Sequence, residues 1–85
     1  MKIVINRCYG GFDLSDKAKE ILGIKYGTEI KRNDPRLVAI VEELGNEANT
    51  WGSSLKIVEI PDDVDWIIED YDGVEWVSEK HRTWS

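Results

Sequence analysis

The residues with the clearest chemical potential stand where the first apolar stretch of the chain gives way to a helical sequence. Gly10 and Gly11 interrupt that stretch, and backbone N–H groups at such a turn, close to a helix start, favour an anion such as phosphate. A polar pair lies just upstream, and two aromatic residues flank the glycines as surfaces on which a base could stack. The candidate ligand-binding residues of this segment are Asn6, Arg7, Tyr9, Gly10, Gly11 and Phe12.

The same residues also fit a purely structural role. The segment YGGF matches neither established phosphate-loop spacing. Two glycines also permit a tight turn, and Phe12 could then fill the core. Both interpretations remain open at the level of sequence.

A second group of candidate ligand-binding residues occupies the C-terminal sequence KHRTW. Lys80, His81 and Arg82 are potentially cationic, and Trp84 adds an aromatic ring, so the segment suits a phosphate and a base. If Arg7 and Arg82 converge, their guanidinium groups grip a dianionic phosphate through charge-assisted hydrogen bonds. The alternative is that Trp84 packs on its own sheet while the basic groups offset nearby acids.

Catalytic groups lack the partners that an active site needs. His81 is the only histidine and Cys8 the only thiol, and no third residue is identifiable as an orienting group. Acid pairs such as Glu69 and Glu75 could hold a divalent cation or act as acid and base, although charged turns usually explain them. We therefore expect a binding protein that is not an enzyme and has no cofactor or metal site, with a small hydrolase as the alternative.

The length and composition predict a single domain over residues 1–85. Of the 85 residues, 41% are hydrophobic and 33% charged, which is enough apolar surface for a folded domain of this size. No apolar run approaches the roughly 20 residues that span a bilayer, and no signal-peptide core is present. The lone cysteine excludes an internal disulfide, so we expect a cytoplasmic protein without membrane contact. Small size without a staple favours a homo-oligomer.

The charge is strongly negative. Seventeen acidic residues against eleven lysines and arginines give a net charge of −6, which disfavours a general nucleic-acid binder. An acidic surface usually provides solubility, and it could also imitate the phosphates of DNA or attract a basic protein. The acids gather in the C-terminal half, at Glu59, Asp62, Asp63, Asp65, Glu69, Asp70, Asp72, Glu75 and Glu79.

The first half of the chain predicts a strand, a helix and a short second strand. Lys2–Arg7 carries an apolar run typical of a strand buried on both faces and central in its sheet. A helix is expected from Ser15, or just after it, to about Leu22, where Gly23 stops it. Thr28–Lys31 is expected to form a short edge strand.

The second half predicts a helix, a strand and a hairpin. Asn33 or Asp34 caps a helix that has Pro35 at its first position. Gly45 is its natural end, although one more turn through Ala48 is possible. A strand over Leu55–Ile60 follows, and then a hairpin over 65–79 around the dipeptide Asp-Gly.

Two registers of this hairpin are possible. A two-residue turn pairs Tyr71 with Val74 and mixes apolar and charged groups on one face. A three-residue turn with Gly73 in the left-handed conformation separates them better, although it places Glu69 opposite Glu75. We favour the three-residue turn, which gathers on one face the apolar side chains of Trp66, Ile68, Val74 and Trp76.

This order of elements is typical of an α+β domain with a single, mostly antiparallel sheet of four to five strands and two helices packed on one face. The opposite face of the sheet is left without a cover. Four tryptophans are also more than so small a core can hide. The surplus predicts either a subunit interface or the lining of a site.

Three segments carry a resemblance to known proteins: MKIVINRCYGGFDLS, LKIVEIPDDVDW and YDGVEWVSEKHRTW. Together they resemble a family of small uncharacterised proteins common in bacteriophage and prophage genomes. The resemblance spans nearly the whole chain and implies a phage context, without a particular chemistry. Small acidic phage proteins of this kind are often antagonists of bacterial defence.

Two functions follow as hypotheses. The first is a phage-encoded protein of the host cytoplasm that sequesters a phosphorylated ligand, a nucleotide or cyclic nucleotide immune signal, where subunits meet. Arg7 and Arg82 would contact the phosphate, and the aromatic residues would stack on the base. The alternative is an acidic inhibitor or DNA mimic that acts on a host defence protein.

Overall fold

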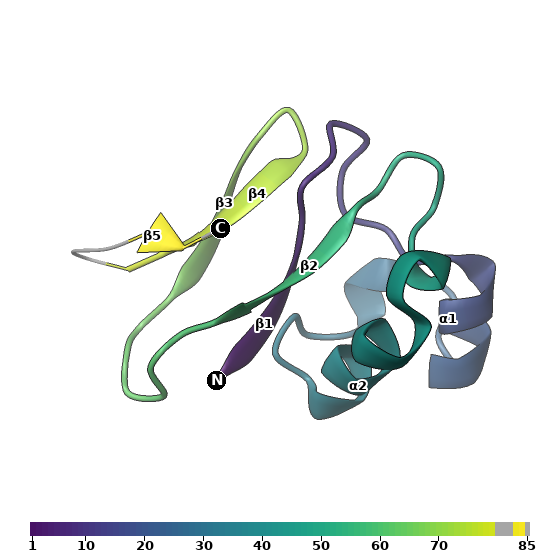
Figure 1. The fold of residues 1–85 in the computed structure, drawn as a ribbon, viewed down its shortest axis with the longest axis horizontal. Helices are drawn as coiled ribbons and strands as arrows, with labels where there is room; N and C mark the ends of the chain where they lie inside the picture. The colour runs from purple at the N-terminus through teal and green to yellow at the C-terminus, as the bar shows by residue number, and fades with distance from the viewer. Residues whose placement is uncertain (80–82, 85) are drawn as a thin grey trace.

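The computed structural model describes residues 1–79 and the backbone of residues 83–84, and it has three layers (Figure 1). Two helices form the first layer, a two-stranded antiparallel sheet β1-β2 the second, and a three-stranded antiparallel sheet β3-β4-β5 the third. In chain order the elements are β1 (Lys2–Asn6), α1 (Asp16–Leu22), the 3-10 helix η1 (Gly27–Glu29), α2 (Pro35–Leu44), the 3-10 helix η2 (Gly45–Ala48), β2 (Leu55–Glu59), β3 (Ile67–Tyr71), β4 (Val74–Ser78) and β5 (Thr83–Trp84).

The α+β class predicted from the sequence is confirmed, but the single sheet is wrong. β1 and β2 form one sheet, and the hairpin forms another with β5. Both helices pack on one face of the β1-β2 sheet, as expected. None of the helices in residues 1–79 has the length and apolar character that crossing a membrane requires.

Helix α1 begins and ends where the sequence predicted. The Ser15 side chain accepts a hydrogen bond from the N–H of Ala18, which satisfies one free donor of the first turn. Gly23 ends the helix in the left-handed conformation, with φ of 71°, and returns its N–H to carbonyls of the last turn. The cap and the stop are both local, so the sequence alone located them.

Helix α2 is defined in the same way. Asp34 is the N-cap, Pro35 is the first helical residue, and the Asp34 carboxylate accepts the N–H of Arg36. Hydrogen bonds from the Arg36 side chain and backbone also lower the pKa of the Asp34 carboxyl below its usual range. The possible further turn after Gly45 is present as η2.

The short strand predicted over Thr28–Lys31 is wrong, because η1 covers its first two residues and the rest belongs to no strand. The Glu29 carboxylate accepts the N–H groups of Tyr26 and Lys25, at 2.7 and 2.5 Å. These backbone hydrogen bonds lower the pKa of Glu29 and close a turn that an extended strand could not make. The local hydrogen bonds of one carboxylate therefore override the strand pattern.

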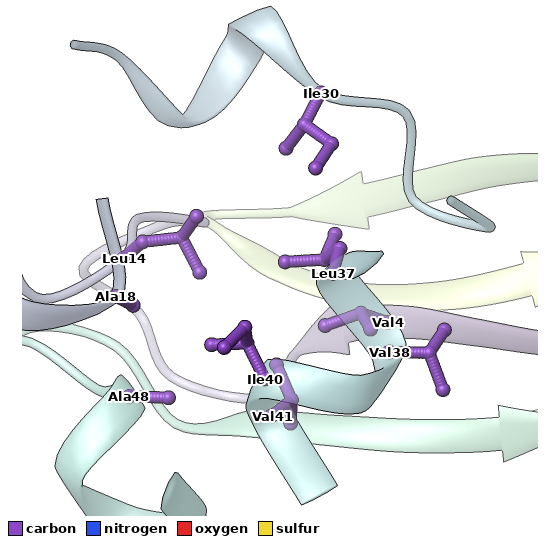
Figure 2. Close-up of a cluster of buried hydrophobic side chains, with 9 residues drawn as sticks. All are labelled: Val4, Leu14, Ala18, Ile30, Leu37, Val38, Ile40, Val41 and Ala48. Carbon is purple, nitrogen blue, oxygen red and sulfur yellow. The ribbon is translucent and has the colours of Figure 1, made fainter. Parts of the chain in front are cut away.

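The first core lies between the helices and the β1-β2 sheet. Val4 of β1 is fully buried there against residues of α1 and α2. Figure 2 shows how side chains from both helices, η2 and the segments between them point toward one another. The buried members are Val4, Leu14, Ala18, Ile30, Leu37, Val38, Ile40, Val41 and Ala48.

The second core lies on the other face of the same sheet. Ile3 and Ile5 of β1 are fully buried there with Val58, Ile60 and Val77. Successive residues of a strand point to opposite faces, so β1 contributes to both cores, as its apolar run predicted. The β3-β4 hairpin therefore covers the sheet face for which the sequence provided no cover.

The hairpin uses the two-residue turn, so the favoured three-residue register is wrong. Tyr71 pairs with Val74, and the turn residues Asp72 and Gly73 have φ of 52° and 90°, as a type I′ turn requires. In this register Glu75 shares the inner face with Ile68 and Val77. The mixture of apolar and charged groups that argued against this register is stable because the charge of Glu75 is paired.

The pairing of Glu75 with Arg32 also explains why the two sheets stay separate. The prediction that β1 is central in its sheet is wrong, because among the described strands β1 pairs with β2 alone. The edge of β1 that faces away from β2 is occupied by side chains and a loop. The N–H of Asn6 donates to Glu75 Oε1 at 2.7 Å, and the N–H of Val4 donates to the Arg32 carbonyl at 2.9 Å. Arg32 Nη1 donates in turn to the Val4 carbonyl at 3.3 Å. The backbone groups of this edge are thus satisfied without a third strand.

Arg32 and Glu75 form a bidentate ion pair within this arrangement. Nη1 lies 2.6 Å from Oε1 and Nη2 lies 2.8 Å from Oε2. The side chains are only 22% and 8% exposed, and the guanidinium group stacks on the ring of Phe12 at 3.5 Å from its centroid. The pair therefore joins the loop before α2, the hairpin and the edge of β1.

Candidate functional site

Three loops meet at one end of the molecule, along the top of Figure 1. We call this surface the three-loop end and define it as residues 8–13, 49–54 and 71–74. A Cβ on Gly10 would lie 1.9 Å from the carbonyl oxygen of Gly52, and a Cβ on Gly73 would lie 2.7 Å from Gly11 N and Tyr9 O. Only glycine permits backbones to approach so closely, so the three loops support one another.

The Asn6 side chain connects the three loops through hydrogen bonds. This side chain is fully buried, and Nδ2 donates to the carbonyls of Cys8 and Gly73 at 2.6 and 2.8 Å. Oδ1 accepts the N–H of Ser54 at 2.8 Å and that of Cys8 at 3.3 Å. One amide therefore satisfies backbone groups in each of the loops, and its hydrogen-bonding capacity is used inside the protein.

Each of the three loops presents one exposed aromatic side chain. Trp51 is fully exposed, and Tyr9 and Tyr71 are 75% and 72% exposed. Large rings that contribute little to the core of their own chain are enriched where proteins bind partners. Because the backbone beneath them is closely packed, binding through these rings would order little additional chain.

The surroundings of these rings are acidic. A surface pocket of about 430 Å³ lies beside the glycine turn, and Asp13, Asp16 and Trp51 contribute to its lining. Asp13 accepts the N–H of Leu14 at 2.8 Å and lies 3.4 Å from Lys19 Nζ. Lys19 therefore offsets the charge of Asp13, whereas no ion pair within residues 1–79 offsets that of Asp16. The remaining negative charge repels a phosphate group, so the geometry here favours a cationic partner over an anion. The complete lining is Gly10, Asp13, Ser15, Asp16, Thr50, Trp51 and Gly52.

The structure gives several of the N-terminal candidate residues internal contacts. The N–H of Gly11 donates to the Cys8 carbonyl at 3.2 Å as part of the turn. Phe12 is half-buried beneath the Arg32 guanidinium group. Asn6 is the buried hub described above. Gly10 also packs against the backbone of Gly52. Of the six predicted residues, these four therefore have structural roles that account for their identity.

Arg7 is exposed and lies against the hairpin. Its Nη1 donates to the Glu75 carbonyl on β4 at 2.8 Å. β5 pairs with the edge of β4 that faces away from β3, and there Trp84 lies opposite Val77. The N-terminal and C-terminal candidate segments thus adjoin the same strand. His81, Arg82 and the side chain of Trp84 lie outside the described residues.

A second surface cleft, of about 740 Å³, lies where the loop before α2 approaches the hairpin. Exposed Lys31 and half-buried Trp66 belong to it, so it combines a cation with an aromatic ring. The sequence does not reveal this cleft, because Thr28–Lys31 has the pattern of an edge strand. Its lining consists of Thr28, Glu29, Ile30, Lys31, Arg32, Asn33 and Trp66.

The groups considered for catalysis do not converge. Glu75 lies on the inner face of the hairpin and is paired with Arg32, whereas Glu69 is on the outer face, where it accepts hydrogen bonds from Trp76 and Ser78. The two carboxylates therefore cannot act as an acid–base pair. Within the part of the chain that the structure describes, no group of three or more His, Cys, Asp and Glu residues could hold a metal ion.

The candidate site at the three-loop end thus combines a closely packed backbone, three exposed rings and neighbouring carboxylates. This arrangement suits recognition of a surface. Comparison of the chain with protein-family models, with curated proteins and with solved structures finds no match in any of the three.

Proposed function

We propose that this chain is a protein-directed inhibitor of phage origin, which occupies a basic surface of a bacterial defence protein in the host cytoplasm. The observation that carries the proposal is the three-loop end, where Tyr9, Trp51 and Tyr71 are exposed on a closely packed base beside carboxylates. The net charge of −6 adds long-range attraction to a basic partner.

The chemistry of this surface defines the partner. Arginine and lysine side chains stack on the faces of tryptophan and tyrosine, and the same cations pair with the carboxylate of Asp16. Rings of this size bury on the order of 150–250 Å² each, which is a large share of a small interface. The expected partner surface is therefore rich in arginine, with Trp51 as the central anchor.

Replacing Trp51 with alanine is expected to weaken partner binding at least tenfold, because exposed rings at the centre of an interface carry much of the binding energy. Stability should change by less than about 0.5 kcal/mol, as for most surface substitutions. The partner is first captured from defence-positive bacteria at low salt and identified. Its affinity for the wild type and the variant is then measured by calorimetry, together with phage plating on the same strain.

Tyr26→Ala is the matched control, because Tyr26 is also an exposed aromatic residue but belongs to the segment before η1. This control should bind as the wild type does. Added salt should weaken binding of both proteins, since the carboxylates are exposed and screened. Full affinity in a variant that lacks all three rings would refute the proposal.

A second candidate function is sequestration of a phosphorylated ligand, a nucleotide or cyclic nucleotide immune signal. The cleft beside η1 supports it, because Lys31 and Trp66 offer a phosphate contact and a stacking surface in one place. Its volume of about 740 Å³ is also in the range that small-molecule sites occupy. A homo-oligomer would enclose such an open cleft more completely.

Native mass spectrometry of the protein with a deproteinised extract of defence-activated bacteria tests this candidate. A gain of a few hundred daltons, the mass range of small-molecule ligands, is the expected result. Lys31→Ala should remove the gain, because it deletes the exposed cation of the cleft. Lys25→Ala should not, since Lys25 lies over Tyr26 and does not line the cleft. An unchanged mass in the wild type would contradict sequestration.

A further inference from the structure

The outer edges of the two sheets differ, because one is closed and the other is open. The edge of β1 is closed by Arg32 and Glu75, as described above. β3 is the terminal strand of its own sheet, and it pairs with β4 on one side only. Among residues 1–79 and 83–84, no strand or loop backbone closes its second edge. An open edge of this kind is a template for another strand.

The register identifies which backbone groups the open edge presents. Residues that flank a two-residue turn exchange hydrogen bonds with each other, and the pattern alternates along the strand. Tyr71, Glu69 and Ile67 therefore direct their N–H and C=O groups toward β4. Ile68 and Asp70 direct theirs outward. An added strand could form up to four hydrogen bonds with these two residues.

The charge around this edge is of one sign. No lysine or arginine lies between Lys56 and Lys80, whereas nine acidic residues do. Glu69, Asp70 and Asp72 are exposed along β3 and its turn. Asp62 is offset by the N-terminal ammonium group and Glu75 by Arg32, but no ion pair of the described residues offsets the acids of β3. The edge is therefore complementary to a basic segment.

The same charges disfavour a second copy of this chain as the occupant. Antiparallel pairing of two β3 strands about their centres would place Glu69 opposite Glu69 of the second copy, and like charges directly opposite destabilise a sheet. Charged residues on edge strands are a common device against such self-pairing. Lysine or arginine at two adjacent positions of an incoming strand would instead lie opposite Glu69 and Asp70.

We propose that β3 binds an extended basic segment of the partner protein as an additional strand of the β3-β4-β5 sheet. This inference rests on the proposed function, because it identifies the element of the partner that the acidic surface recognises. Backbone hydrogen bonds at Ile68 and Asp70 provide the alignment, and the adjacent carboxylates of Glu69 and Asp70 select the basic pair. Exposed Ile67 and Tyr71 flank Glu69 on the outer face.

The test uses the full chain and a short synthetic peptide of valine and threonine with two adjacent central lysines. Amide hydrogen exchange is measured by NMR with and without this peptide. The N–H groups of Ile68 and Asp70 should exchange at least tenfold more slowly in the complex, because they become hydrogen-bonded. A peptide with glutamates in place of the lysines should give no protection. Unchanged exchange at both amides would overturn the proposal.

Asp70→Pro tests the edge directly. It deletes an outward N–H while leaving the β4 ladder intact, and proline is tolerated at such an edge position. Lysine-peptide affinity should fall at least tenfold with an unchanged circular dichroism spectrum, whereas Asp70→Asn, which retains the N–H, should lose only a few-fold. Asp70→Lys avoids proline altogether. This variant should reverse the binding preference, so that the glutamate peptide binds more tightly than the lysine peptide. If the wild type, Asp70→Pro and Asp70→Lys bound the lysine peptide equally, the proposal that the edge of β3 binds it would be refuted.

Two further outcomes separate this proposal from its alternatives. Protection of Ile68 and Asp70 in a dimer of the free protein would overturn it in favour of a second copy. If Trp51→Ala abolishes binding of the host partner while the peptide leaves β3 unprotected, the edge is refuted and the inhibitor function stands. If β3 is protected but no loop variant affects the host partner, the proposed function fails while the edge remains a peptide site.

Discussion

Replacing Glu75 with alanine is expected to lower the free energy of unfolding by about 3–5 kcal/mol, because it leaves the Arg32 guanidinium group without its counter-charge in a largely dry site. Both oxygens of Glu75 accept hydrogen bonds from Arg32, and Oε1 also accepts the N–H of Asn6. The side chain is 8% exposed, so water cannot easily replace these partners. Urea denaturation followed by tryptophan fluorescence measures the loss.

Matched variants separate charge from packing at this pair. Glu75→Gln retains an acceptor for the N–H of Asn6 but removes the charge, so its loss should be smaller than that of the alanine variant. Lys2→Ala breaks an exposed ion pair with Glu42, at 3.2 Å, and should cost less than about 1 kcal/mol. A loss for Glu75→Ala as small as that for Lys2→Ala would show that the buried pair does not hold the layers together.

The double variant Arg32→Met with Glu75→Met extends the test. Apolar side chains in place of both partners leave no buried charge. The double variant should therefore lose less stability than the sum of the losses of the two single variants. The recovery of stability should be incomplete, because the N–H of Asn6 loses its acceptor on Glu75 and the carbonyl of Val4 loses its donor on Arg32. A double variant with strictly additive losses would contradict direct coupling of the two side chains.

Replacing Asn6 with alanine is expected to cost about 3–4 kcal/mol, since each buried backbone group that loses its partner costs about 1–3 kcal/mol. The Asn6 amide serves Cys8, Ser54 and Gly73 together. Its removal should therefore also loosen the three-loop end, and the amide of Ser54 should exchange faster with solvent. Thermal denaturation and amide hydrogen exchange measure the two effects.

Asn46→Ala provides the control for this change, because Asn46 is exposed in η2 and should contribute less than about 0.5 kcal/mol. Asn6→Asp retains the acceptor of Ser54 but loses the donor to Cys8 and Gly73, so it should also destabilise the protein. If Asn6→Ala left the exchange of Ser54 unchanged, Asn6 would not be the hub of the three loops.

The candidate site was predicted from the sequence only in part. The glycine pair drew attention to the segment that does form part of the three-loop end, and Tyr9 is exposed there. Trp51 and Tyr71 were not included, because nothing local relates a loop near residue 50 or a hairpin turn to residue 9. A pair of glycines at positions 10 and 52 was the available signal, since close backbone contact between distant loops needs glycine on at least one side.

By itself, the sequence determined the helices with their caps, the strands β1 and β2, the position of the hairpin turn and the α+β class. Each depends on residues within a few positions of one another: Ser15 and Gly23 bound α1, Asp34 and Pro35 start α2, and a continuous apolar run marks β1. Such signals act within one turn or one strand, and they persist whatever the rest of the chain does.

Only the tertiary structure decided the hairpin register, the division into two sheets and the roles of Asn6 and Glu75. Glu75 becomes an inner residue because Arg32, 43 positions earlier, neutralises it, and because the N–H of Asn6, 69 positions earlier, needs an acceptor. Residue patterns along a strand contain no information about such distant partners. A buried ion pair therefore reversed the register that segregation of apolar side chains favoured, and it left β3 as the open edge.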